Sequence, residues 1–367
     1  MARLDSICKL NMGQSPDSRS YNEEGRGIPF FQGNADFGDL YPSVRVWCDA
    51  PTKIAHEGDI LISVRAPIGA LNIANRECCI GRGLAALTVN ESICNKKYLW
   101  YCISSKVDEL NAKGTGSTFK AISKNVLAET EIVLPNIEHQ TKIANELELV
   151  FNLIFLRKQQ LSKLDELVKS RFIELFGGKG YPEDTLLNLC NIIDYRGKTP
   201  EKVEDGLPFI TAKNVKMHQM NLEPREYISK ETYDKVMVRG FPKEGDVVFT
   251  TEAPLGNVCR IPHFDTEFYI GQRIVTMQTE KLEPIYLEYA LSSDDFKTKY
   301  MEKSSGSTVT GIRVRLLEQL TIPVPPRDIQ TQFSAFVEQT DKSKFEIQKS
   351  LEKLETLKKA LMQKYFG

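Results

Sequence analysis

Apolar side chains recur at alternating three- and four-residue steps along two stretches of the chain, 143–175 and 333–365. This spacing places them on one face of an α-helix, as in the a and d positions of a heptad. Prolines precede both stretches and glycines follow them, which predicts where each helix begins and ends. We expect two long helices with apolar stripes at Ile143, Leu147, Val150, Ile154, Leu161, Leu164 and Val168, and at Phe333, Val337, Ile347, Leu351, Leu354 and Leu361.

Each such stripe would be exposed to water on an isolated helix. A helix of roughly 35–40 residues is about 50–60 Å long, and two of them can bury each other's stripes. Polar residues within the stripes, such as Arg157, Thr340 and Lys344, would favour a single register of antiparallel pairing. The alternative is that both are ordinary core helices of their domains. The many charges of EKLETLKKALMQK favour pairing.

Short runs of β-forming residues fill the stretch before each helix. DILISV, AALTV, DVVFTT and RIVTMQT are separated by Gly-, Pro- and Asn-rich turns, and one further helix is expected at YLWYCISSKVDEL and at YLEYALSSDDFKTKY. The chain therefore predicts an α+β fold with two strand-rich modules, a first module at 1–130 and a second module at 178–320. Helical segments at 131–177 and 321–367 follow them.

The two halves of the chain repeat one another. Residues 113–177 align without a gap on 303–367, at an offset of 190, with 19 identities in 65 positions. Upstream, EGDILISVRAPIG matches EGDVVFTTEAPLG and IGRG matches IGQR, whereas QGNADFGDLYPSVRVWCDA and TAKNVKMHQMNLEPREYISKETY, which occupy the same place in the two halves, differ in sequence. A shared frame with divergent inserts suits two readers of two different ligands, arranged about a pseudo-twofold axis. The other interpretation is a repeat with a scaffolding role alone.

Composition and motifs exclude several functional classes. The chain has 367 residues, 41% of them hydrophobic and 26% charged, and it lacks an apolar run long enough for a membrane helix or a signal peptide, so we expect a cytoplasmic protein. Eight cysteines show no C-x-x-C spacing, so we expect reduced packing residues and no metal. Phosphate-loop, nucleophile-elbow and H-E-x-x-H patterns are absent from the sequence.

Local clusters of basic residues contrast with the net charge of −1. No acid lies between Glu109 and Glu129 or between Glu302 and Glu318, and each stretch carries a charge of +3 beside a Gly-Ser-Thr run. Small hydroxyl residues flanked by cations suit phosphate oxygens, although the same composition is typical of a solvated loop. The candidates for binding DNA here are Lys113, Ser117, Thr118, Lys120, Lys124, Lys303, Ser307, Thr308, Arg313 and Arg315.

Three further arginines lie next to short predicted strands: Arg65, Arg82 and Arg273. Arginine is the most common reader of guanine in the major groove. A purely structural role for these arginines is as plausible from sequence. Arg45 and Lys213 are weaker candidates of the same kind.

With these segments in view, the chain resembles the HsdS-type specificity subunits of type I restriction–modification systems. The resemblance rests on the duplicated GST…P…QT…helix segments, the GxPF openings and the EGD strands, and it covers almost the whole chain. It implies two target recognition domains that read the halves of a split DNA site and two helices that space them. The chain departs from the family pattern in one respect: it begins almost directly in the first module, so we expect any helical segment before that module to be minimal.

The resemblance further implies partners: double-stranded DNA, two methyltransferase subunits and, in a full enzyme, restriction and translocase subunits. S-adenosylmethionine and ATP would belong to those partners, so we expect neither cofactors nor catalytic residues in this chain and no contact with a membrane. Two alternatives remain open. One is a protein-interaction scaffold without sequence-specific DNA binding, and the other is a modification enzyme with an unrecognised active site.

Overall fold

The computed structural model describes residues 1–116, 120–195, 200–306 and 310–367. These residues form two compact units. Unit 1 comprises Met1–Gln159 and Gln348–Gly367, and unit 2 comprises Gln160–Ile347. Each unit therefore contains one strand-rich module, the first part of the long helix that follows it, and the last part of the other long helix.

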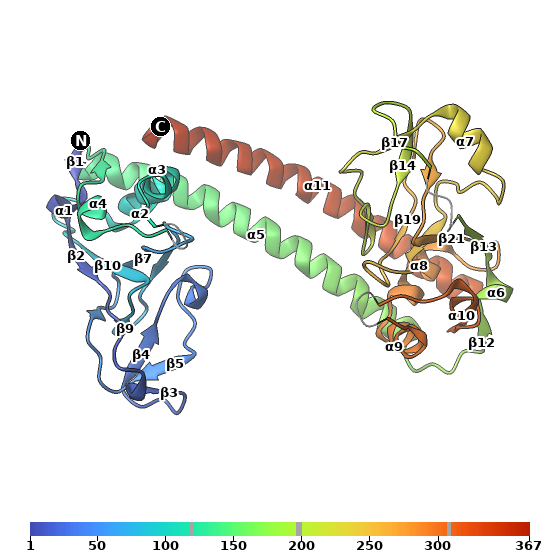
Figure 1. Ribbon diagram of the computed structural model, residues 1–367, viewed down its shortest axis with the longest axis horizontal. Coiled ribbons are helices and arrows are strands. Elements are labelled where there is room, and N and C mark those ends of the chain that lie inside the picture. Colours follow the sequence, from blue (N-terminus) through green and yellow to red (C-terminus); the bar gives the residue numbers. More distant parts are fainter. Residues whose placement is uncertain (117–119, 196–199, 307–309) are drawn as a thin grey trace. The chain divides into compact units, whose positions relative to one another are not determined.

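Unit 1 is organised around two sheets (Figure 1). An antiparallel sheet has the order β2-β10-β7-β8, formed by Cys8–Met12, Leu84–Val89, Ile60–Ser63 and Leu71–Ile73. A second sheet has the order β3-β5-β4-β9-β6, formed by Tyr21–Asn22, Val46–Cys48, Ile28–Phe31, Cys78–Ile80 and Ile54–Ala55. Its pair β4 and β9 is parallel.

Unit 2 repeats this plan. Its antiparallel sheet has the order β13-β21-β18-β19, formed by Asn191–Asp194, Ile274–Gln278, Val247–Thr250 and Val258–Arg260. A second sheet, β17-β14-β20, is formed by Tyr227–Ile228, Leu207–Ile210 and Tyr269–Ile270 and again contains one parallel pair. A hairpin of β15 (Val215–Lys216) and β16 (Gln219–Met220) is added to this plan.

A two-stranded sheet lies at the base of each module. In unit 1, β1 (Ala2–Arg3) pairs with β11 (Glu131–Ile132), and in unit 2, β12 (Glu183–Thr185) pairs with β22 (Thr321–Pro323). Both β11 and β22 lie a few residues before a long helix, so each helix starts close to a strand of this sheet. The helical segments that we expected from residues 131 and 321 thus begin with short strands, and their helices start at Ile137 and Arg327.

Short helices cover the sheets. Unit 1 contains α1 (Leu4–Ile7), α2 (Lys96–Ser105), α3 (Val107–Ala112), α4 (Lys124–Ala128) and the 3-10 helices η1 (Ser18–Ser20) and η2 (Asn34–Asp36). Unit 2 contains α6 (Leu186–Leu189), α7 (Lys230–Val236), α8 (Pro284–Ser292), α9 (Asp294–Lys303) and α10 (Val314–Leu317). The single helices expected after residues 98 and 286 are therefore each a pair of helices.

The two long helices are α5 (Ile137–Phe176) and α11 (Arg327–Phe366). Pro135 lies just before α5, and Asn136 caps it by accepting a hydrogen bond from the His139 N–H (2.9 Å). Pro325 and Pro326 lie just before α11, where a ring fixes φ without loss of a helical hydrogen bond. Gly178 follows α5 with φ +62°, a left-handed conformation that ends the helix.

The helices run antiparallel within each unit. In unit 1, Glu146 accepts a hydrogen bond from the Tyr365 hydroxyl (2.6 Å), and further along α5 Lys158 pairs with Glu355 (3.3 Å), so residue numbers rise on one helix as they fall on the other. In unit 2, Asp165 pairs with Lys344 (2.6 Å). The predicted fold class, α+β with two strand-rich modules and a pair of long antiparallel helices, is confirmed.

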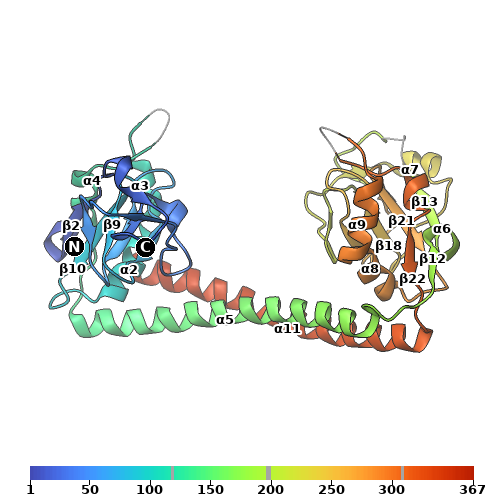
Figure 2. The same cartoon turned by 90° about the horizontal axis from the view of Figure 1, so that it is seen from below.

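The last residue of each long helix packs into the module of the opposite repeat. Phe366 lies against Tyr98 in unit 1, and Phe176 lies against Tyr286 in unit 2, with ring centroids 5.5 Å and 4.7 Å apart. The end of α11 is seen beside the first module in Figure 2. This exchange gives a structural reason for the repeated Phe-Gly ends of the two helices.

Among the described residues, no helix combines the length and apolar character that crossing a membrane requires.

Candidate nucleic-acid interface

Three repeated segments that are distant in sequence meet in unit 1. They are the turn after β7 around Val64 and Arg65, the turn before β10 around Arg82 and Gly83, and the loop 113–124. The Val64 N–H donates to the Gly83 carbonyl (2.9 Å), and the Ile122 N–H donates to the Val64 carbonyl (2.9 Å). The basic loop and two predicted arginines therefore belong to one surface.

Unit 2 makes the same connections with the equivalent residues. The Thr251 N–H donates to the Arg273 carbonyl (2.8 Å), and the Ile312 N–H donates to the Thr251 carbonyl (2.9 Å). Because these bonds involve only backbone atoms, they can hold the three segments together whatever side chains the segments carry. We call these three hydrogen-bonded segments of each unit the frame. The frame can therefore present a different set of side chains in each unit.

The side chains of unit 1 form a pocket of about 590 Å³ on this surface. Arg65 and Arg82 both line it, together with Arg45, which sequence analysis ranked as a weaker candidate. Among the residues that the structure describes, neither Arg65 nor Arg82 has a side-chain hydrogen bond or an ion pair. The remaining lining comprises Tyr21, Glu23, Phe30, Gln32, Gly33, Asn34, Ala35, Asp36, Val46 and Gly83.

A buried carboxylate fixes the third arginine of this pocket. Asp36 is 7% exposed and accepts hydrogen bonds from the Gln32 N–H (2.7 Å) and from Arg45 Nε (3.1 Å), and it also pairs with the terminal guanidinium nitrogen of Arg45. The stretch 32–50, whose sequence diverges from that of the corresponding stretch in the other half, supplies these residues. Comparison of the repeats therefore could not find the Asp36–Arg45 pair.

The equivalent surface of unit 2 is different in charge. Glu252 occupies the position of Arg65, Gln272 that of Arg82, and Arg273 that of Gly83. Arg273 adopts φ +71° and pairs with Glu252 through Nε (2.8 Å). Lys213, a weaker candidate of sequence analysis, lies exposed 3.9 Å from Glu226. The structure thus joins Arg273 to an acid that sequence analysis did not connect with it.

The basic loops are only partly described. Lys120, Lys124, Arg313 and Arg315 are exposed, whereas Lys113 pairs with Glu109 (2.7 Å). Lys303 is the exposed last residue of α9. The candidates Ser117, Thr118, Ser307 and Thr308 lie outside the described residues.

The residues of the predicted helix stripes differ in burial. Most are shielded from solvent on the long helices, while Leu161, Leu164, Ile347 and Leu354 are partly exposed. The buried ones are Ile143, Leu147, Val150, Ile154, Val168, Phe333, Val337, Leu351 and Leu361.

A buried glutamine joins each module to its long helix, a feature that sequence analysis missed. Gln140 Oε1 accepts from the Asn95 N–H (2.8 Å), and its Nε2 donates to the Pro135 carbonyl (2.7 Å). Gln330 makes the same two bonds, to the Glu283 N–H (2.9 Å) and the Pro325 carbonyl (2.8 Å). In the sequence, the only indication of this role was that Gln140-Thr141 and Gln330-Thr331 are identical in the aligned repeats.

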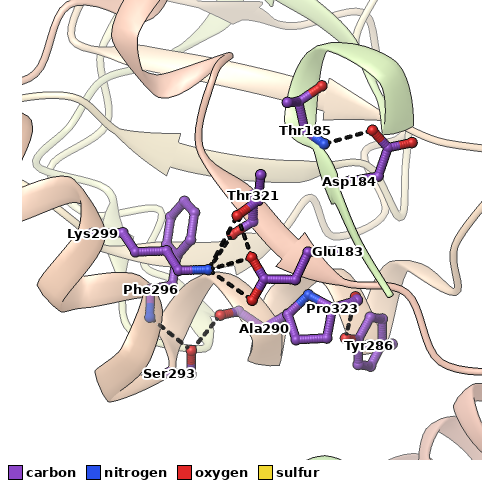
Figure 3. A network of polar contacts seen from close by, with 10 residues as sticks. All are labelled: Glu183, Asp184, Thr185, Tyr286, Ala290, Ser293, Phe296, Lys299, Thr321 and Pro323. Carbon is purple, nitrogen blue, oxygen red and sulfur yellow. Dashed lines mark hydrogen bonds and ion pairs between the residues drawn. The ribbon is translucent and has the colours of Figure 1, made fainter. Parts of the chain in front are cut away.

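We call the connection that Gln140 or Gln330 makes between a module and its long helix the joint. A tyrosine adds a further hydrogen bond close to each joint. The Tyr98 hydroxyl donates to the Val133 carbonyl, and the Tyr286 hydroxyl donates to the Pro323 carbonyl, both at 2.7 Å. In unit 2, Figure 3 shows that Lys299 also reaches Glu183 and Thr321 across the base sheet, with Nζ to Oε2 at 2.9 Å. Each module is therefore fixed to the start of its helix by bonds that the two units share.

The cysteines do not form a reactive centre in the described part of the chain. All eight are buried with free thiols, and no metal-binding group of His, Cys, Asp or Glu is found among the described residues. Burial raises the pKa of the Cys8, Cys78, Cys190 and Cys259 thiols to about 12, so the reactive thiolate is scarce near neutral pH.

Comparison with known proteins places this geometry in a family. The model of the type I restriction modification DNA specificity domain matches residues 1–166 and 183–359. A Methanocaldococcus jannaschii protein provisionally named as the type I restriction enzyme MjaX specificity subunit is 40% identical over 171 residues, which are 47% of this chain and 40% of that protein. The Escherichia coli EcoBI specificity subunit is 20% identical over 99% of this chain and 84% of its own length.

Two solved structures share the fold. The S subunit of a type I restriction–modification system from M. genitalium has a TM-score of 0.64 at 17% identity, covering 100% of this chain and 95% of that one. A chain from a study of complex assembly and conformational transition in the type I system has a TM-score of 0.58 at 20% identity, with 100% and 96% covered. The resemblance inferred from sequence is confirmed.

Proposed function

The chain belongs to the family of type I restriction modification DNA specificity domains, and we propose that it selects the DNA site of such a system by binding one half of a bipartite duplex with each module. The observation that carries this proposal is the repeated backbone frame. Equivalent hydrogen bonds hold three segments together in both units, while the side chains on the frame differ. One scaffold with two sets of side chains suits two different half-sites.

In this proposal, the exposed cations beside the frame contact phosphates and the pocket residues contact base edges. The phosphate contacts come from Lys120, Lys124, Arg313 and Arg315, with support from Lys113 and Lys303. Ser117, Thr118, Ser307 and Thr308, which lie outside the described residues, are proposed to bind phosphate oxygens as well. A net charge of −1 is consistent with a complex in which partner subunits supply much of the affinity for the polyanion.

Catalysis and cofactor binding are assigned to partners: two methyltransferase subunits and, in a restricting system, restriction and translocase subunits. An exposed apolar stripe on α5 supports a docking surface for the methyltransferase. Leu149 and Leu156 are 61% and 52% exposed, and Leu153 lies between them at helical spacing. Exposed leucines on one helix face are costly in water and typical of a protein interface.

Nuclease protection of random-sequence DNA by the complex with its methyltransferase tests the function. We expect protection of two short blocks separated by an unprotected spacer of fixed length. Protection without sequence preference would contradict the proposal and favour the protein-interaction scaffold. Transfer of methyl groups by the chain without a partner would contradict the assignment of catalysis to other subunits.

Substitution of Lys120, Lys124, Arg313 and Arg315 by glutamine tests the phosphate contacts. The plot of log K against log salt has a negative slope, and each lost phosphate contact makes it less steep by about 0.9. Loss of four contacts should therefore reduce the steepness by about 3.6. Glutamine at Lys342, Lys353 and Lys359, which are exposed on α11, is a control that removes three charges outside the loops. An unchanged slope in the fourfold variant would remove the loops from the interface.

A further inference from the structure

We propose that the pocket of unit 1 recognises guanine in the major groove of the half-site that the first module binds. The inference rests on the proposed function and adds the identity of the base. Arg65 and Arg82 donate to guanine O6 and N7, and Arg45, held by Asp36, donates beside them.

The chemistry of the lining points to this base. Guanine presents two acceptors, O6 and N7, on its major-groove edge, and the forked guanidinium donates to both at once. Three arginines face the pocket from three different segments, and the exposed Arg65 and Arg82 have no side-chain hydrogen bond or ion pair with a described residue. An acceptor-rich base edge satisfies these donors, whereas cytosine and adenine would bring amino groups toward them.

Asp36 makes one of these arginines rigid before DNA arrives. Its carboxylate is buried and holds Arg45 Nε at 3.1 Å, while the Gln32 N–H fixes the carboxylate itself. An arginine oriented in advance loses less side-chain entropy on binding than a free one. Asp36 is therefore a positioning residue: it orients Arg45 and does not itself contact the base.

The second module lacks this arrangement, which makes the inference specific to one half-site. Glu252 and Gln272 stand where unit 1 has Arg65 and Arg82, and Glu252 is paired with Arg273. A carboxylate repels the acceptors of guanine. Arg65→Glu and Arg82→Gln, which place the residues of unit 2 at the equivalent positions of unit 1, are therefore suitable test substitutions.

The test is selection of binding sites from randomised duplex DNA by the full chain in complex with its methyltransferase. We expect the wild type to select a bipartite site with guanine in one half. Arg82→Gln and Arg65→Glu should each reduce the preference for guanine at a position of that half-site, by roughly 5- to 150-fold, and leave the other half-site unchanged. Arg76→Gln, an exposed arginine between β8 and β9, is the matched control and should change nothing.

Two further variants separate recognition from charge and from folding. Arg65→Lys retains the charge but loses the fork, and we expect a weaker guanine preference with little change in salt dependence. Asp36→Asn retains the shape of the side chain but releases Arg45, and we expect a weaker guanine preference with an unchanged salt slope.

The outcomes are distinguishable. A loss of affinity that is equal for all sequences, with a lower salt slope, would show that the arginines bind phosphate and would overturn the inference. An unchanged guanine preference in both Arg65→Glu and Arg82→Gln, or no guanine in the half-site that they alter, would also overturn it. If the wild type selects no bipartite site at all, the proposed function itself fails.

Discussion

The two units attach their modules to the long helices in the same way, but they present different side chains on the surface beside the basic loops. At the joint, Gln140 and Gln330 make equivalent bonds to the module and to the residue before the helix. On the frame, by contrast, Arg65 corresponds to Glu252. The joint serves the same geometric purpose in both units, so its residues are the same. The frame is held by backbone atoms, so its side chains are free to differ.

The units also differ at a buried position on α8. Glu288 on α8 is 1% exposed and accepts from Arg260 Nε (2.6 Å), and its other oxygen lies 2.8 Å from His218 Nδ1. Unit 1 has Trp100 at this place in its repeat. His218 belongs to the β15–β16 hairpin, which is added to the shared plan in unit 2. Glu288 therefore contacts a hairpin that has no equivalent among the described strands of unit 1.

Replacing the shared glutamine should produce the largest effect on stability. Gln330→Leu leaves the Glu283 N–H and the Pro325 carbonyl buried without partners, which we expect to lower the free energy of unfolding by about 3 kcal/mol. Denaturant unfolding measures this change. Gln332→Leu makes the same substitution at an exposed position two residues along α11 and should cost less than about 0.5 kcal/mol. Similar values for the two variants would contradict the role of the joint.

Gln140→Leu extends this prediction to unit 1. Because its bonds match those of Gln330, we expect a loss of similar size. A loss in one unit and none in the other would show that the two joints are equivalent in geometry but not in energy.

Removing the buried carboxylate of unit 2 should have a smaller, local effect. Glu288→Ala leaves Arg260 without its closest partner, and we expect a loss of about 2 kcal/mol because Arg260 is partly exposed and retains Asp341 at 3.4 Å. Hydrogen exchange should quicken at amides of the β15–β16 hairpin and leave unit 1 unchanged. Glu338→Ala, exposed on α11, is the control. Unchanged exchange in the hairpin would mean that Glu288 does not anchor it.

The same comparison explains how much the sequence could predict. The heptads and the gap-free repeat were enough to predict the two long helices and the two modules, because periodicity and duplication are properties of the chain itself, whereas the family came from the resemblance of the duplicated motifs. The meeting of Arg65, Arg82 and the basic loop required tertiary structure, because these segments are separated in sequence. The Asp36–Arg45 pair lies in a stretch where the two halves diverge in sequence, so the internal comparison could not reveal it. The Gln-Thr identity was visible, but a glutamine near a helix start does not by itself indicate a buried joint.

The smallest expected effect concerns pH and the base sheet of unit 2. Hydrogen bonds from Thr321 and Lys299 lower the pKa of Glu183 below its usual 4.5. A carboxyl group with a lowered pKa stabilises the folded state above its unfolded pKa, and this contribution is lost as pH falls through the folded value. Since the Glu183 side chain is 45% exposed, we expect no more than about 1 kcal/mol at neutral pH.

A double-mutant cycle of Glu183→Gln and Lys299→Gln, followed by denaturant unfolding, measures this term. The coupling free energy between the two side chains should be favourable at pH 7 and should shrink steadily below pH 4.5, as Glu183 takes up a proton and Lys299 loses its charged partner. Raising the salt concentration at pH 7 should weaken the coupling as well, because both side chains are accessible to solvent. A coupling that stays constant from pH 7 to below the folded pKa would contradict this prediction, because it would show that the interaction of Lys299 with Glu183 in Figure 3 does not depend on the charge of Glu183.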